Sequence, residues 1–176
     1  MAAALALGER GIGRTGNNPS VGCVIVNDGK IVGRGWTQPG GRPHAEAVAL
    51  EQAGEAAHGA TVYVTLEPCA HLSERGLACS DMLIAVHPKQ IVIAVEDPDP
   101  RTRGKGTAKL HASGIEVITG VMASEARTAL AGFISRIERK RPYVTLKLAI
   151  SLDGAIAMAD GSSRWISGEA SRAHAI

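Results

Sequence analysis

Four residues of this sequence combine types and spacing that suit a catalytic metal site. His44 and Glu46 stand two positions apart, Cys69 follows a Glu67-Pro68 pair, and Cys79 comes after nine further residues. One imidazole and two thiolates leave zinc a fourth position for water, which is the layout of catalytic rather than closed structural sites. Zinc lowers the pKa of such a water toward ~7, and Glu46, which is not counted as a ligand, would move the protons. The pattern therefore predicts metal-assisted hydrolysis.

The same residues fit a narrower pattern, with one departure. Zinc deaminases carry H-x-E followed by P-C-x-x-C, but here nine residues rather than two separate Cys69 from Cys79. A structural zinc site stays open as an alternative, with His71 as its fourth protein ligand. Cys23 lies in an expected buried strand, where a core residue is more typical than a ligand.

Strands and helices that alternate along the chain must hold these residues. Asn27-Asp28-Gly29 between the apolar runs 21–26 and 30–36 is a strong hairpin signal. Hydrophobic spacing predicts further strands over 61–66, 90–95 and 115–118, and helices over 1–9, 44–57, 79–86, 107–113 and 124–137. The first helix is expected to be the end of a longer one, and the last to be capped by Ser124. This alternation predicts an α/β fold, with a mixed sheet covered by helices on both faces.

Each candidate ligand falls at the end of an expected element. Cys69 follows a strand at its carboxyl end, where open α/β sheets place ligands. Cys79 begins a helix, and the free N–H groups there favour the thiolate, which is the ligating form. His44 and Glu46 lie in the first turn of a helix, so both side chains can reach a metal beyond its end.

Composition narrows the class of partner. The chain has 176 residues, of which 45% are hydrophobic and 20% charged, and its formal net charge is +2. Its densest basic run, 136–141, is interrupted by Glu138, and five aromatic residues are too few for a stacking platform. No stretch reaches the ~20 apolar residues of a membrane span, and three cysteines favour reduced thiols in a cytoplasmic protein. We therefore expect a small-molecule ligand, with neither nucleic acid nor membrane as partner.

The pattern changes near Arg141-Pro142. Residues 143–150 predict a new strand, Asp153-Gly154 a turn, and residues 168–176 the start of a helix. Such a short segment cannot bury a core of its own, so we expect the front edge of a second α/β domain that is incomplete here. Its apolar strand has an open edge, which predicts self-association or local disorder and leaves a homo-oligomer open.

Longer motifs are more specific than the metal pattern. They are Asn18-Pro19-Ser20-Val21-Gly22, Pro43-His44-Ala45-Glu46, Thr65-Leu66-Glu67-Pro68-Cys69, Asp97-Pro98-Asp99-Pro100, Arg141 to Lys147, Ser151-Leu152-Asp153-Gly154 and Trp165-Ile166. Through them the chain resembles the bifunctional deaminase/reductase family of riboflavin biosynthesis over essentially all of its length. The resemblance implies a cytidine-deaminase-like three-layer α/β/α fold, with a zinc-dependent deaminase domain over 1–140 and the N-terminal fragment of a reductase domain over 141–176.

The resemblance also implies a reaction, in which 2,5-diamino-6-ribosylamino-4(3H)-pyrimidinone 5′-phosphate is hydrolysed at its 2-amino group to 5-amino-6-(5-phosphoribosylamino)uracil and ammonia. Family positions near the substrate match Asn18, His71 and Arg75, and a guanidinium fork at Arg75 suits phosphate oxygens. Three features depart from the family. Asn17 replaces a usual Pro, Thr37 replaces a frequent His, and the loop between the two cysteines is one residue longer, so the placement of Arg75 depends on the alignment.

The family's reductase half uses NADPH to reduce the ribosyl group to ribityl. Lys147, Ser151, Trp165 and Ser167 match positions near that site, but the cofactor site is incomplete, and we expect no reductase activity from this chain. Three alternatives remain: another cytidine- or guanine-type deaminase, a nucleic-acid deaminase, and a non-catalytic zinc module. A nucleic-acid deaminase would keep the short Cys-x-x-Cys spacing and a basic, aromatic surface, which this chain lacks.

Overall fold

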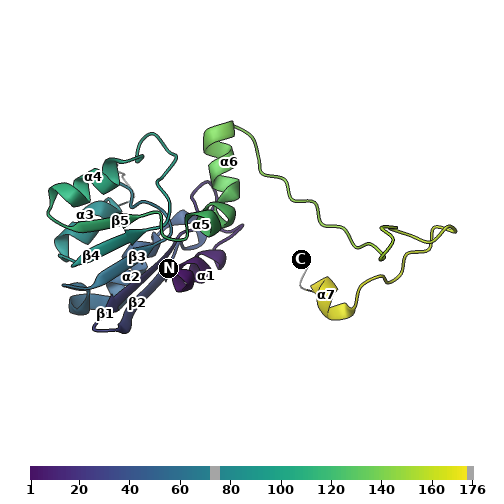
Figure 1. Ribbon diagram of the computed structural model, residues 1–176, viewed down its shortest axis with the longest axis horizontal. Coiled ribbons are helices and arrows are strands. Elements are labelled where there is room, and N and C mark those ends of the chain that lie inside the picture. Colours follow the sequence, from purple (N-terminus) through teal and green to yellow (C-terminus); the bar gives the residue numbers. More distant parts are fainter. Residues whose placement is uncertain (72–75, 174–176) are drawn as a thin grey trace. The chain divides into compact units, whose positions relative to one another are not determined.

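The computed structural model describes residues 1–71 and 76–173. Within them, five strands form one sheet in the order β2-β1-β3-β4-β5 (Figure 1). The strands are β1 Gly22–Asn27, β2 Lys30–Trp36, β3 Thr61–Val64, β4 Gln90–Ile93 and β5 Glu116–Thr119. The helices are α1 Ala2–Glu9, α2 Ala45–Ala53, α3 Cys79–Ala85, α4 Lys105–Ala112, α5 Ala123–Ala129, α6 Ala131–Arg139 and α7 Glu169–Ala173, with 3-10 turns at Pro39–Gly41 and Gly54–Ala57.

The hairpin that opens the sheet forms where the sequence predicts it. β1 and β2 pair antiparallel from Gly22 opposite Trp36 to Asn27 opposite Lys30. Asp28 and Gly29 both have positive φ, at 48° and 72°. Two successive residues of this kind make the turn whose twist matches that of the flanking strands.

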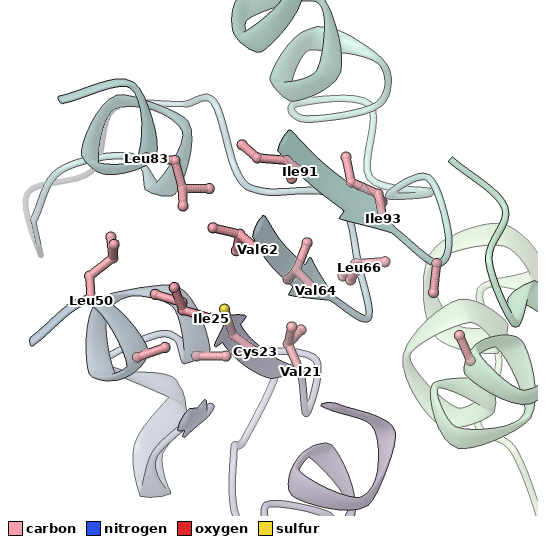
Figure 2. Packing of buried hydrophobic residues seen from close by; sticks show 14 of the residues in the cluster. Val21, Cys23, Ile25, Leu50, Val62, Val64, Leu66, Leu83, Ile91 and Ile93 are labelled. Carbon is pink, nitrogen blue, oxygen red and sulfur yellow. The ribbon is translucent and has the colours of Figure 1, made fainter. Parts of the chain in front are cut away.

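The sheet is mixed and has helices on both faces. β1 pairs antiparallel with β3, whereas β3–β4 and β4–β5 are parallel. Successive side chains of a strand point to opposite faces, so Cys23 and Ile25 join the core cluster that contains α2, and Val24 joins the cluster that contains α1. Figure 2 shows the larger of these clusters, in which side chains of β1, β3 and β4 pack together. The predicted three-layer α/β/α architecture is confirmed.

A glycine sets how closely α2 approaches the hairpin. A Cβ at Gly35 of β2 would overlap the carbonyl oxygen of Ala45, the first residue of α2. The helix backbone therefore lies directly on the strand backbone, with no side chain between them. This contact fixes the N-terminal turn of α2, which carries His44 and Glu46.

One predicted helix is two helices. The spacing over 124–137 predicts a single helix capped by Ser124, but α5 and α6 are separated at Leu130, whose φ and ψ are −96° and 10°. Met122 occupies the cap position of α5, and no side chain caps it. Ala126, Leu130 and Ile134 lie in one core cluster on both sides of the break.

The chain divides into two compact units, Met1–Tyr143 and Val144–Ile176. The predicted strand over 143–150 is wrong, because no strand occurs there in the described part of the chain. Leu146 is 77% exposed and Val144 80%, so neither side chain has the neighbouring strand or helix that a stable strand needs. The predicted turn at Asp153-Gly154 is present, with Gly154 N–H donating to Ser151 O, and the predicted final helix is α7.

No helix in the described ranges is long and apolar enough to cross a membrane.

Candidate active site

Three elements bring His44, Cys69 and Cys79 together. His44 caps α2 in an extended conformation, Cys69 follows β3, and Cys79 is the first residue of α3. His44 Nδ1 lies 3.2 Å from Cys79 Sγ and 3.7 Å from Cys69 Sγ. The three donor atoms lie within 4.8 Å of one another, and no other such group of three occurs among the residues that the structure describes.

This donor set fits zinc. Zinc–sulfur bonds of about 2.3 Å and zinc–nitrogen bonds of about 2.0 Å in a tetrahedron separate neighbouring ligand atoms by roughly 3.5 Å. The measured separations of 3.2 Å and 3.7 Å bracket that value. His71, the alternative fourth ligand, does not belong to the group. Its Nδ1 lies instead 3.2 Å from the Thr102 hydroxyl, so the geometry does not support a closed structural site.

The local electrostatics favour a thiolate. A hydrogen bond from the Cys79 thiol, followed by one from His44, lowers the pKa of Cys69 to about 4, although burial opposes this. The backbone N–H of Cys79 also donates to Cys69 Sγ over 3.3 Å. The same Cys69–Cys79 hydrogen bond raises the pKa of Cys79, and the hydrogen bond with Cys69 raises that of His44. These hydrogen bonds therefore favour the thiolate form of Cys69, which is the form that binds metals.

Glu46 shares this environment. Its side chain is buried, at 4% exposure, and burial raises the pKa of its carboxyl group. His44, Cys69 and Cys79 all act electrostatically or by hydrogen bonding on Glu46. A buried carboxyl beside a metal site, with its pKa moved toward neutrality, is suited to accept a proton and to return it.

A pocket of about 240 Å³ opens above these residues. His44, Glu46 and Cys69 line it, together with two predicted substrate contacts, Asn18 and His71. The Asn18 amide donates to Gly41 O over 2.8 Å, which ties the 15–20 loop to the segment that precedes His44.

Three further residues were singled out from the sequence, namely Thr37, Arg75 and Cys23. Thr37 lines it, but its hydroxyl accepts a hydrogen bond from Val21 N over 3.0 Å. Arg75 lies outside the described residues. Cys23 is fully buried in the sheet and lies in the core cluster, which is its expected position.

This pocket also has an acidic wall that was not predicted from the sequence. Asp97 and Asp99 follow β4 and line the pocket with Arg101. Burial raises the pKa of Asp97 to about 6, whereas hydrogen bonds from Arg101 lower the pKa of Asp99 to about 2. Both residues stand beyond the carboxyl end of a parallel strand, which is where α/β sheets bind ligands. That rule, applied to β4 as it was to β3, would have identified them.

The four positions matched to the reductase half lie in the second unit and are only partly brought together. Ser151 and Trp165 line one hollow of about 570 Å³, which Lys147 and Ser167 do not line. The Ser151 hydroxyl bonds to Asp153, and the Arg172 guanidinium lies 4.2 Å from the Trp165 ring centroid.

Comparison with known proteins then identifies the family. Residues 1–95 match the family model described as the cytidine and deoxycytidylate deaminase zinc-binding region, and residues 142–175 match the RibD C-terminal domain. The chain belongs to the RibD family of zinc-binding deaminases. RibD proteins bear the name riboflavin biosynthesis protein, so the resemblance drawn from the motifs is confirmed.

Individual RibD proteins are similar along nearly the whole chain. RibD of Escherichia coli (strain K12) is 50% identical over 172 residues, which cover 98% of this chain and 47% of that protein. RibD of Aquifex aeolicus (strain VF5) is 49% identical over 172 residues, which cover 98% and 48%. A solved diaminohydroxyphosphoribosylaminopyrimidine deaminase/5-amino-6-(5-phosphoribosylamino)uracil reductase from Thermotoga maritima is 40% identical with a TM-score of 0.88, covering 99% and 51%. The chain spans about half the length of the curated relatives it matches.

Proposed function

We propose that this chain binds one zinc ion through His44, Cys69 and Cys79 and deaminates 2,5-diamino-6-ribosylamino-4(3H)-pyrimidinone 5′-phosphate to 5-amino-6-(5-phosphoribosylamino)uracil and ammonia. The observation that carries the proposal is the pocket in which two of the three donors meet the buried Glu46. The name of the Thermotoga maritima relative, which covers 99% of this chain, supports the substrate.

The chain's own groups account for the proton transfers. Zinc, when bound, supplies Lewis-acid chemistry that activates water near neutral pH. The Glu46 carboxylate takes a proton from the water as the new C–O bond forms at the ring carbon. It then delivers a proton to the amino group, so that the C–N bond breaks and ammonia leaves. Burial serves both steps, because a raised pKa makes the Glu46 carboxyl a better base and keeps it able to hold the proton between them.

The pocket walls supply substrate contacts in this proposal. Asn18 and His71 line the pocket and are each held by a hydrogen bond to a neighbouring segment. Such tethers reduce the entropy that is lost when a polar side chain binds a ligand. Arg75 is assigned to the phosphate on the family resemblance, and its fork suits phosphate oxygens.

The remaining assignments concern the longer proteins of the family. We propose that residues 1–140 form the deaminase domain and that 141–176 begin a reductase domain, where Lys147, Ser151, Trp165 and Ser167 would serve an NADPH-dependent step. A cytoplasmic location belongs to the same proposal, because the thiols that would bind zinc are free in the described structure and must stay reduced. Sedimentation measurements would determine whether the chain forms a homo-oligomer.

The test is ammonia release from the diaminopyrimidinone ribosyl phosphate, with the zinc content determined on the same sample. We expect turnover with about one zinc per chain. Zinc without turnover on this ring, but with turnover on cytidine or guanine, would replace the substrate assignment. Zinc without turnover on any of these rings would favour the non-catalytic zinc module.

A further inference from the structure

A second buried glutamate lines the pocket, and the mechanism above does not use it. Glu67 is 3% exposed. Its Oε2 accepts hydrogen bonds from the backbone N–H of Asp97 over 3.2 Å and of Gly104 over 3.0 Å. Its Oε1 accepts a third, from the backbone N–H of Thr107, over 2.9 Å. Three backbone donors on one carboxylate neutralise its burial cost and make strong, charge-assisted hydrogen bonds.

The three donors bracket one segment of the chain. Asp97 stands where the chain leaves β4, while Gly104 caps α4 and Thr107 lies in its first turn. Between them, Asp99 and Arg101 line the pocket. The segment 97–104 has no regular secondary structure of its own, so the hydrogen bonds of Glu67 to its two ends contribute to its position.

Glu67 also stands two residues before Cys69, and the packing around it is close. A Cβ at Gly106 of α4 would overlap the carbonyl oxygen of Pro68 and would come within 3.2 Å of Glu67 Oε1. The first turn of α4 therefore rests directly on the Glu67-Pro68 segment. A separate contact, between His71 and the Thr102 hydroxyl, ties the same two segments together.

We propose that Glu67 is a positioning residue that fixes the position of segment 97–104, which carries the acidic wall of the pocket, relative to the metal site. The proposal rests on the proposed deaminase function for its kinetic consequence. Glu67 lines the pocket, but backbone N–H groups occupy both of its oxygens, so it is not placed to exchange protons with a substrate. Its role is to link, by hydrogen bonds, the segment that carries Cys69 to the segment that carries Asp97 and Asp99.

The experiment compares two substitutions that remove the same charge. Glu67→Gln keeps the shape of the side chain but turns one acceptor into an NH2 group, so at least one backbone N–H loses its partner. Glu96→Gln is the matched control, because that carboxylate lies one residue before Asp97 but is 62% exposed and faces Arg103, at 3.8 Å. Three quantities are measured on each purified protein: amide hydrogen exchange at Asp97, Gly104 and Thr107, zinc content, and kcat and KM for ammonia release.

For Glu67→Gln we expect exchange at those three amides to become faster than in the unsubstituted protein, while exchange at the amides of β1 and β3 stays the same. We also expect unchanged zinc content and a fall in kcat/KM of about tenfold to a hundredfold. The fall should come mainly from KM, since Glu46 and the metal donors keep their places. Glu96→Gln should match the unsubstituted protein in all three measurements. Gly106→Ala should also speed exchange at these three amides, because its methyl group pushes α4 away from Pro68 without replacing the carboxylate.

Two results would overturn the proposal. Unchanged exchange at the three amides would show that Glu67 does not hold the wall. Loss of zinc from Glu67→Gln would show that it supports the metal site instead. If the unsubstituted protein releases no ammonia from the named substrate, the proposed function fails on its own, and the exchange and zinc measurements still decide the role of Glu67.

Discussion

The two units of the chain contain similar apolar, β-branched segments and use them differently. In the first unit, Val62 and Val64 of β3 are completely buried between β1 and β4. In the second, Leu146 is 77% exposed and residues 143–150 form no strand in the described structure. Strand propensity is largely the ability to fit a half-buried pleated surface. A segment that has a high strand propensity but no neighbouring strand does not form a strand.

The same difference separates the chemistry of the two units. In the first, three donor atoms from three parts of the chain meet the buried Glu46 carboxylate in one small region. In the second, two of the four matched positions line a common hollow and the other two do not. Packing is what converts a set of suitable residues into a site, and matched substitutions in the two units test that contrast.

The largest effect is expected from a pair of charge-removing substitutions, one in each unit. Glu46→Gln should lower kcat for ammonia release by about 10²–10⁴-fold, because it removes the group that moves protons, while zinc content stays at the unsubstituted level. Lys147→Gln should leave both quantities unchanged. Turnover that survives in Glu46→Gln would show that another group carries the protons.

A second pair compares the two environments of leucine. Leu83 of α3 is completely buried, whereas Leu148 is 58% exposed. Leu83→Ala should lower the free energy of unfolding by about 2–5 kcal/mol, and Leu148→Ala should change it by less than about 0.5 kcal/mol. Urea denaturation followed by circular dichroism measures both. Equal losses would mean that the second unit buries Leu148 in solution, for example by self-association.

A third pair compares two glycines. Gly35→Ala should cost about 1–3 kcal/mol of unfolding free energy, since the new methyl group overlaps the Ala45 carbonyl oxygen and must push α2 away. A methyl group added at Gly168 would meet no atom of the described residues within 4 Å, so Gly168→Ala should be close to neutral. The shift of α2 should also reduce zinc content in Gly35→Ala, because that helix carries His44. Thermal melts with zinc analysis check both effects, and a normal zinc content would argue that α2 can move without disturbing the site.

The smallest effect concerns acid stability. Arg101 lowers the pKa of Asp99 to about 2, below the ~3.9 of an unfolded chain. A lowered folded-state pKa contributes stability that is complete above pH ~4 and is lost as the pH falls toward about 2. Arg101→Gln should therefore be less stable near neutral pH, with the difference vanishing at the acid end. Because Arg101 is 70% exposed, the difference should stay below about 1 kcal/mol.

The control for this prediction lies in the second unit. The Ser151 hydroxyl lowers the pKa of the fully exposed Asp153, so Ser151→Ala should not change the pH dependence of unfolding measurably. Urea titrations across the acid range up to neutral pH separate the two cases. A pH-independent loss in Arg101→Gln would assign the role of Arg101 to packing.

Local signals in the sequence were enough to predict most of the fold. Asp28-Gly29 between apolar runs specified the hairpin, and alternating periodicity specified the order of strands and helices. The break at Leu130 was not predictable, because Ala126, Leu130 and Ile134 recur at the spacing of one continuous helix and all lie in one core cluster. The strand over 143–150 failed for the opposite reason, since its local signal is strong and its neighbours are lacking.

The metal donors could be selected from the sequence because their residue types are chemically restrictive and each stands at the end of an element. Glu67 could not, although it lies in the same Glu-Pro-Cys motif. Its partners are backbone N–H groups, which every residue but proline carries, and they lie at positions 97, 104 and 107. No sequence pattern marks a backbone donor, so only the structure reveals what that carboxylate holds.

The direct backbone contact between Gly35 and α2 limits how this molecule can be redesigned. Because backbone rests on backbone there, any side chain added at Gly35 would push away the helix that carries His44 and Glu46. A designer who wants a different ring accepted would therefore keep the hairpin and α2 unchanged and vary the 97–104 loop, which lines the pocket and has no regular secondary structure. New specificity in this scaffold would come from grafted loops rather than from a repacked sheet.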